Sequence, residues 1–128
     1  MPAQTLPHIL IIDDDAMNRE ILEAFLEGDY RITLANNGAR GLALAEDDPP
    51  ALIILDINMP DMDGFAVCES LKHQPHTQDI PVVFVTSYDS PQDMSRGQAV
   101  GAAAFLSRPF DGDDLLNLVA ELIQQHLD

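Results

Sequence analysis

Acidic side chains directly follow two of the apolar runs in this sequence. Asp13 and Asp14 follow the run His8–Ile12, and Asp56 follows the run Ala51–Leu55. Two carboxylates about 5 Å apart repel each other by roughly 3 kcal/mol at an effective dielectric constant of about 20. If folding brings the three acids into one cleft, that cleft will favour protonation or a bound cation. Oxygen ligands on short loops suit Mg²⁺, with Mn²⁺ as a substitute, because Mg²⁺ keeps several waters and needs few protein ligands.

A hydroxyl and a guanidinium group follow two further runs. Thr86 follows the run Pro81–Val85, and Arg108 follows the run Ala103–Ser107. Both side chains can donate hydrogen bonds to phosphoryl oxygens, and the guanidinium also brings a positive charge. With the acids they indicate attack by the Asp56 carboxylate on a phosphorus atom, while a cation and these donors neutralise the phosphoryl oxygens.

The elements that must position these groups are five short runs with strand composition. Three of them are apolar without alternation, which is typical of strands buried on both faces of a parallel sheet. One run is weaker and alternates. In chain order the predicted strands are His8–Ile12, Tyr30–Ala35, Ala51–Leu55, Pro81–Val85 and Ala103–Ser107.

Segments with helical spacing of apolar residues separate the runs and follow the last one. The least apolar segment nevertheless begins with Ser90, Pro91 and Asp93, which is a favourable N-cap, a first-turn proline and an acidic third position. The predicted helices are Met17–Glu27, Ala39–Glu46, Phe65–His73, Ser90–Gln98 and Asp113–Leu127.

A strand followed by a helix, repeated five times, predicts an α/β fold with a five-stranded parallel sheet and right-handed crossovers. Helices on both faces make this a doubly wound three-layer sandwich. The 128 residues are expected to form a single domain, 1–128, because no linker composition interrupts them. In open parallel sheets ligands bind beyond the carboxyl ends of the strands, so Asp13 or Asp14 would lie close to Asp56 if their strands are neighbours.

The composition excludes several classes of function. Lys and Arg number 6 and Asp and Glu number 22, which gives a net charge of −16. Such a chain repels nucleic acid and anionic membranes, so we expect neither as a direct partner. Cys68 is the single cysteine, which excludes an intrachain disulfide and favours a cytoplasmic location. The apolar runs are too short to span a membrane, and the N-terminal segment lacks the regions of a secretory signal.

Each group by itself has a simpler structural explanation. The acids from Asp13 to Asp15 could cap a helix, and Asp56 could cap a turn in the loop that ends at Gly64. A lone threonine or arginine carries little information. Only their joint position after strands that the fold would place side by side indicates a shared site.

These residues make the chain resemble the receiver domain of bacterial two-component response regulators. The resemblance covers essentially the whole chain and rests on four segments in this order: ILIIDDDAMNRE, LIILDINMPDMDG, VVFVTS and FLSRPF. It implies a flavodoxin-like (βα)5 fold with strand order 2-1-3-4-5. It also implies phosphorelay signalling, with a sensor histidine kinase or phosphotransfer protein as partner.

The resemblance also implies roles for the acidic residues. Asp56 corresponds to the phosphoacceptor, which takes a phosphoryl group from a phosphohistidine. Asp14 would contact Mg²⁺ directly and Asp13 through water. Asn58 would offer its backbone carbonyl to the metal. The domain would therefore be a phosphoacceptor and not an enzyme, apart from self-phosphorylation and autodephosphorylation.

Further positions match the family's switch. Thr86 corresponds to the hydroxyl that moves onto the phosphoryl group, and Phe105 to the aromatic residue that turns inward behind it. Pro109 would follow a cis peptide bond. These movements would repack the face formed by 89–101, the fifth strand and the last helix, which could form a homodimer or contact an output domain or protein outside this chain.

Arg108 departs from the family pattern, which has lysine at this position. Three consequences stay open: retained function, an altered phosphorylation lifetime or switch, and a pseudo-receiver that acts as an interaction module without phosphate. A separate alternative is a phosphatase of the haloacid dehalogenase type, which also uses an aspartate nucleophile. That class has a second acid where this chain has Asn58.

Overall fold

Strands and helices alternate along the chain in the computed structural model, which describes residues 6–127. All strand pairs are parallel, and the sheet has the order β2-β1-β3-β4-β5. The predicted α/β fold is therefore confirmed, including the strand order. The strands are β1 (His8–Ile12), β2 (Arg31–Ala35), β3 (Leu52–Leu55), β4 (Val82–Thr86) and β5 (Ala104–Ser107).

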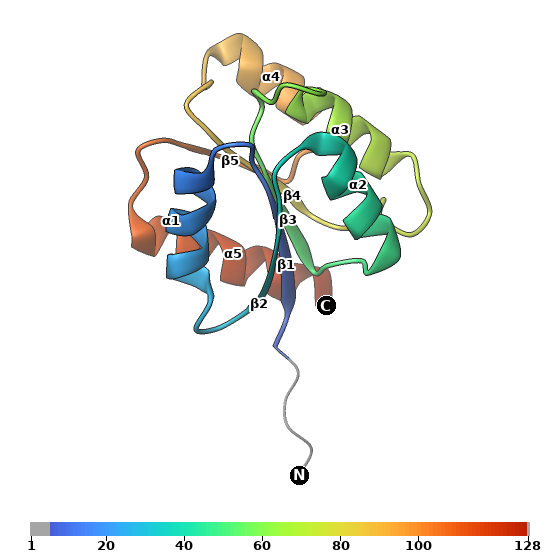
Figure 1. The fold of residues 1–128 in the computed structure, drawn as a ribbon. Helices are drawn as coiled ribbons and strands as arrows, with labels where there is room; N and C mark the ends of the chain where they lie inside the picture. Colours follow the sequence, from blue (N-terminus) through green and yellow to red (C-terminus); the bar gives the residue numbers. More distant parts are fainter. Residues whose placement is uncertain (1–5, 128) are drawn as a thin grey trace.

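Helices cover both faces of the sheet and produce three layers (Figure 1). Figure 1 shows α1 and α5 on one face and α2, α3 and α4 on the other. Side chains of β1, β3 and β4 are buried toward both layers, which explains why these strands lack polar alternation. The helices are α1 (Ala16–Leu26), α2 (Gly38–Asp47), α3 (Gly64–Lys72), α4 (Pro91–Ala99) and α5 (Gly112–Leu127).

Two apolar cores lie on opposite faces of the sheet. The core beneath α2 and α3 contains Phe65 and Phe84, and the core beneath α1 and α5 contains Leu22 and Val119. Burying large apolar side chains contributes about 1.5–3 kcal/mol each. This packing fixes the strands and therefore the loops at their carboxyl ends.

The bounds of several elements differ by one residue from those predicted. Helices α1, α2 and α3 each begin one residue earlier, because Asp15, Asn37 and Asp63 accept backbone N–H bonds as N-caps. The predicted cap of α4 is present, since the Asp93 N–H donates to Ser90 Oγ (3.0 Å). Thr86 forms the last residue of β4 instead of following the strand, because it pairs with Ser107. Among the described residues, no helix is long and apolar enough to cross a membrane.

Candidate functional site

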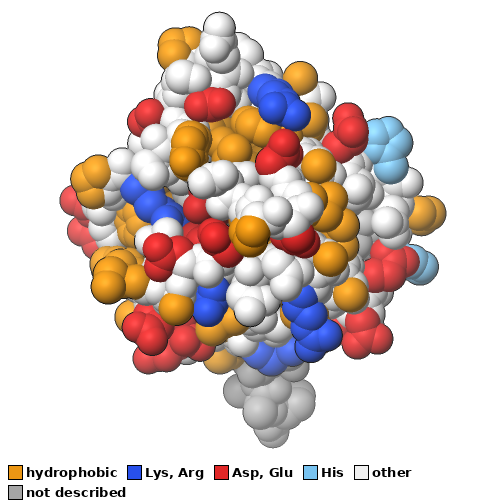
Figure 2. All heavy atoms as spheres, turned by 45° about the horizontal axis from the view of Figure 1, so that its top comes forward, with side chains coloured by type: hydrophobic (Ala, Val, Ile, Leu, Met, Phe, Trp, Pro, Cys, Tyr) orange, Lys and Arg blue, Asp and Glu red, His pale blue; other side chains and the backbone are white. Residues whose placement is uncertain are grey.

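Pairing of β1 with β3 brings the predicted acids together at the carboxyl edge of the sheet. Ile12 is the ladder partner of Leu55, and the Asp56 N–H donates to the Ile12 carbonyl oxygen (3.1 Å). One carboxylate oxygen each of Asp13, Asp14 and Asp56 lies within 4.8 Å of the other two. Figure 2, which turns the top of Figure 1 forward, shows acidic side chains gathered near the middle of this face.

The carboxylate of Asp13 is buried and held by two donors. Its Oδ1 accepts the Asp15 N–H (2.9 Å), and its Oδ2 accepts Nη2 of Arg108 (2.8 Å). The Arg19 Nη1 group also donates to the Asp13 backbone carbonyl (2.8 Å). Arg19 was not among the predicted site residues. Its position near the start of α1 could have indicated this contact, because a long side chain there can reach back to the preceding loop.

The Asp56 carboxyl lies in an environment that disfavours its charge. Burial is the main cause that raises the pKa of Asp56, and the neighbouring Asp13 carboxylate raises it further. A hydrogen bond with Thr86, the Ile57 N–H (2.7 Å) and the Arg108 charge lower the pKa only in part. A positive group that approaches Asp56 would therefore stabilise its ionised carboxylate.

Thr86 is fully buried beside Asp56, and a tyrosine lies over this part of the site. Thr86 Oγ1 accepts the backbone N–H of Tyr88 (3.1 Å). The exposed side chain of Asn58 donates from Nδ2 to the Tyr88 hydroxyl (3.1 Å). This bridge joins the loop after β3 to the loop after β4. Tyr88 was not predicted, because nothing in its local sequence pattern distinguishes it from a surface tyrosine.

Phe105 lies in β5 and packs against the core instead of against the acids. Its ring centroid is 5.5 Å from that of Phe84, which is 5.4 Å from that of Phe65. Gly97 of α4 lies over the Phe105 ring, so that a Cβ there would come within 3.1 Å of it. The three rings therefore connect α3, β4 and β5 beneath α4.

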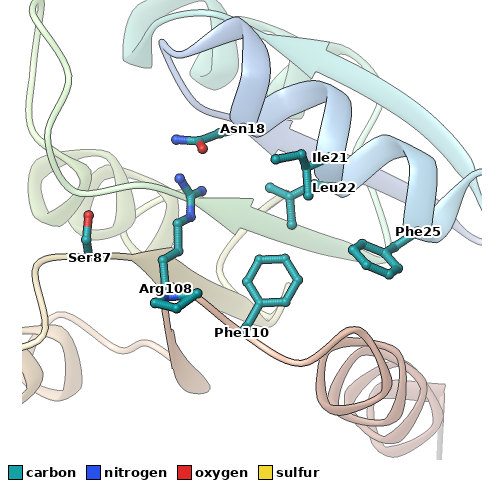
Figure 3. Close-up of a pocket in the computed structure, with 8 residues that line it drawn as sticks. Asn18, Ile21, Leu22, Phe25, Ser87, Arg108 and Phe110 are labelled. Atoms are coloured by element: carbon teal, nitrogen blue, oxygen red, sulfur yellow. The ribbon is translucent and has the colours of Figure 1, made fainter.

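Arg108 also borders an apolar groove next to the acids (Figure 3). The groove has a volume of about 500 Å³ and lies between α1 and the loop that follows β5. The peptide bond between Arg108 and Pro109 in this loop is cis. Figure 3 shows the Arg108 guanidinium extended toward Asn18, with Phe25 and Phe110 farther along the groove. The lining residues are Asn18, Ile21, Leu22, Phe25, Ser87, Arg108, Pro109 and Phe110.

Asp61 fixes the loop after β3 to α2. Its two carboxylate oxygens accept the N–H groups of Gly38 (3.0 Å) and Ala39 (2.9 Å), at the start of that helix. These backbone bonds hold the pKa of Asp61 below its ordinary range. This contact was not predicted, because it joins residues that are 22 and 23 positions apart in the sequence.

The three gathered carboxylates fit a divalent cation by chemistry and by charge. Their oxygens are the hard ligands that Mg²⁺ prefers, and Asp14 stays exposed to admit water. The Arg108 side chain supplies one positive charge against three negative ones. A cluster of this kind is typical of the magnesium site of receiver domains.

Comparisons with known proteins agree with this geometry. The family model for the response regulator receiver domain matches residues 9–120. The response regulator PleD of Caulobacter vibrioides is 44% identical over 104 residues, which cover 80% of this chain and 23% of PleD. The protein PilH of Pseudomonas aeruginosa is 35% identical over 115 residues, which cover 89% of this chain and 95% of PilH. The chain thus spans about a quarter of PleD and nearly all of PilH.

Solved structures resemble the chain over most of its length. A CheY-like receiver domain protein from Methanospirillum hungatei matches with a TM-score of 0.89 at 28% identity, covering 95% of this chain and 97% of that one. The chemotaxis protein CheY4 of Vibrio cholerae matches with a TM-score of 0.87 at 29% identity, covering 92% and 99%. Sequence and fold therefore point to the same family.

Proposed function

The chain belongs to the response regulator receiver domain family, and on that premise we propose that Asp56 accepts a phosphoryl group. Receiver domains act in phosphorelay signalling and are signalling modules instead of enzymes with turnover. The observation that carries the proposal is the convergence of carboxylate oxygens of Asp13, Asp14 and Asp56 within 4.8 Å of one another. Burial and the like charge of Asp13 both disfavour the ionised form of Asp56.

In the proposed step, a carboxylate oxygen of Asp56 attacks the phosphorus of a phosphohistidine in a sensor histidine kinase or phosphotransfer protein. A P–O bond forms while the P–N bond breaks, and the bonding electron pair leaves with the imidazole nitrogen. That nitrogen takes up a proton, so the products are an acyl phosphate on Asp56 and a neutral histidine.

Asp13, Asp14, Asp56 and the backbone carbonyl of Asn58 are the groups proposed to hold Mg²⁺ or Mn²⁺. When bound, the cation supplies positive charge next to the phosphoryl oxygens. Thr86 and Arg108 supply the remaining positive and hydrogen-bonding groups from this chain. The burial of Thr86 and its lowering effect on the pKa of Asp56 support this role, because both place the hydroxyl next to the proposed acceptor.

Output is proposed to follow from a shift between two packings of the same core. A phosphoryl group on Asp56 would draw in the Thr86 hydroxyl, and Phe105 would turn further inward along the ring of Phe84. Because Gly97 lies against Phe105, this movement would repack the face formed by α4, β5 and α5. The shift requires that the phosphoryl group bind one packing better than the other. The repacked face would then bind a second copy or an output domain or protein outside this chain.

The phosphodonor is proposed to dock along α1. Met17, Ile21 and Phe25 lie four residues apart on this helix and are 68%, 43% and 43% exposed. This apolar stripe continues into the groove that leads to Arg108 and the acids. A helix of the histidine-bearing partner, packed against the stripe, could place its phosphohistidine over Asp56. A cytoplasmic location would give the domain access to such a partner.

The test uses the purified chain with acetyl phosphate and MgCl₂, followed by intact-mass measurement. We expect the mass of one phosphoryl group to be added to the unmodified chain and to the control Asp79→Asn, whose exposed carboxyl precedes β4 at the other end of the strand. We expect none to be added to Asp56→Asn. Equal labelling of Asp56→Asn would remove Asp56 from the role.

The same preparation separates the two alternative functions. A chain that accepts no phosphoryl group, and whose association state is unchanged by beryllofluoride, would be a phosphate-independent interaction module. Steady multiple turnover of a phosphomonoester would instead indicate the phosphatase. Asn58 argues against that enzyme, because its amide cannot act as a general acid or base.

A further inference from the structure

The carboxylate of Asp13 has a resident positive partner in this chain. Arg108 Nη2 donates to Asp13 Oδ2 over 2.8 Å, and the two side chains are 15% and 1% exposed. The other carboxylate oxygen accepts the Asp15 N–H. Both oxygens of Asp13 are therefore engaged by groups of the protein itself.

This contact is strong because it is buried and charged. Charge-assisted bonds of about 2.8 Å are roughly twice as strong as neutral ones, and low exposure removes the competition from water. A guanidinium presents a planar array of donors, whereas an ammonium is a compact point charge. Arg108 can therefore satisfy a buried carboxylate oxygen while its remaining N–H groups stay directed elsewhere.

We propose that Arg108 competes with the divalent cation for Asp13 and thereby sets the cation affinity of the acidic cluster. This inference rests on the proposed function, because it assumes that the cluster binds Mg²⁺. A cation that uses Asp13, directly or through water, must open or share the Arg108–Asp13 pair. The positive charge of Arg108 also repels the approaching ion. The chain consequently holds a weaker cation site than its three carboxylates alone would form.

The surroundings of Arg108 give the released side chain a place to go. Its guanidinium extends toward Asn18 at the mouth of the groove, and Ser87 lines the same groove (Figure 3). Both side chains can accept hydrogen bonds from a guanidinium. Arg108 can thus exchange its carboxylate partner for neutral acceptors without becoming an unpaired buried charge.

The test measures Mg²⁺ affinity by calorimetry in the unphosphorylated full chain and in two matched variants. Arg108→Met removes the competing charge and keeps much of the side-chain volume. Arg19→Met removes a charge beside the same residue but leaves the carboxylate pair, because the Arg19 guanidinium donates to the backbone carbonyl of Asp13. We expect Arg108→Met to bind Mg²⁺ at least fivefold more tightly than the unmodified chain, and Arg19→Met to stay within twofold. Equal effects of the two substitutions, or none, would overturn the inference.

A second measurement needs no variant and covers the case in which Arg108→Met fails to fold. In ¹⁵N spectra of arginine side chains, the Arg108 Nε–H signal should shift on titration with Mg²⁺ and the Arg19 signal should not. An unmoved Arg108 signal at saturating Mg²⁺ would contradict the inference while Asp56 labelling could still succeed. A chain that binds no Mg²⁺ and accepts no phosphoryl group would overturn the proposed function together with it.

Discussion

Gly64, the first residue of α3, lies so close to Asp56 that a side-chain carbon there would overlap the Asp56 carbonyl oxygen. The Gly64 N–H donates to the Ile57 carbonyl oxygen (2.8 Å), which closes the intervening loop. The backbone of Asp56 and the start of α3 are therefore one packed unit, and the position of the proposed acceptor depends on the absence of a side chain eight residues later.

Gly64→Ala should destabilise the fold and displace Asp56. The new Cβ would also come within 2.9 Å of the Ile57 Cα, and backbone atoms cannot swing aside as side chains can. We expect a loss of about 1–3 kcal/mol in the free energy of unfolding, the usual range for overpacking. Urea denaturation measures the loss, and acetyl phosphate labelling should fall in the same variant. Gly28→Ala is the control, because nothing lies within 4 Å of its Cβ position. Equal stability of the two variants would contradict the packing described.

Asp56→Asn should raise thermal stability at neutral pH in the absence of divalent cations. The pKa of Asp56 is raised by burial, so the folded state holds this proton more tightly than the unfolded state does. Stability therefore falls as pH rises from the ordinary value of 3.8 through the raised folded pKa. The substitution removes the free-energy cost of ionising the buried Asp56 carboxyl. The higher stability of Asp56→Asn over the unmodified chain should therefore vanish below pH 3.8. Calorimetric scans across pH check this, and a variant less stable than the unmodified chain at pH 7 would contradict it.

Asp61→Asn should have the opposite effect, although it lies in the same loop. The pKa of Asp61 is lowered by the N–H groups of Ala39 and Gly38, so its charge contributes stability above the ordinary value of 3.8. That contribution is lost as pH falls through the lowered folded pKa. The variant should melt below the unmodified chain at pH 7, with a difference that shrinks in acid. A constant difference at all pH values would mean that the charge of Asp61 is not the cause.

Phe25→Ser should weaken docking of the histidine-bearing phosphodonor protein without changing the phosphorylation chemistry at Asp56. Phe25 belongs to the exposed stripe of α1 and lies 6.0 Å from the ring of Phe110 across the groove. Its loss should slow phosphotransfer from a histidine kinase or phosphotransfer protein about tenfold, the scale of one buried apolar contact at an interface. Labelling by acetyl phosphate should be unchanged, since Phe25 lies farther along the groove from Arg108 (Figure 3). A parallel fall in both rates would show that the substitution disturbs the site itself.

Much of the fold could be predicted because its signals are local. The buried strands β1, β3 and β4 lack polar alternation, and helix caps such as Asp15 and Ser90 mark where helices begin. Strand order followed from the family resemblance, since local patterns do not specify which strands pair. The errors of one residue at element ends arise because N-caps and sheet pairing, and not hydrophobicity, determine where each element begins and ends.

The contacts within the site were harder to predict for a physical reason. Acids at strand ends could be placed near one another, because parallel strands share one carboxyl edge. The partner of Arg108 could not be derived, since its side chain reaches a residue 95 positions away and its direction depends on packing. Tyr88 and Asp61 were missed for the same reason. Tyr88 contacts the loop after β3 and Asp61 contacts the start of α2, and only the folded chain brings these segments near.

Chemical trapping of the acyl phosphate identifies the residue that carries phosphorus. The chain is phosphorylated with acetyl phosphate and Mg²⁺, reduced with borohydride, which converts an aspartyl phosphate to homoserine, and mapped by peptide mass spectrometry. We expect homoserine at position 56 only, dependent on Mg²⁺ and lost when EDTA is present. Homoserine at another aspartate, or equal conversion in EDTA, would contradict it.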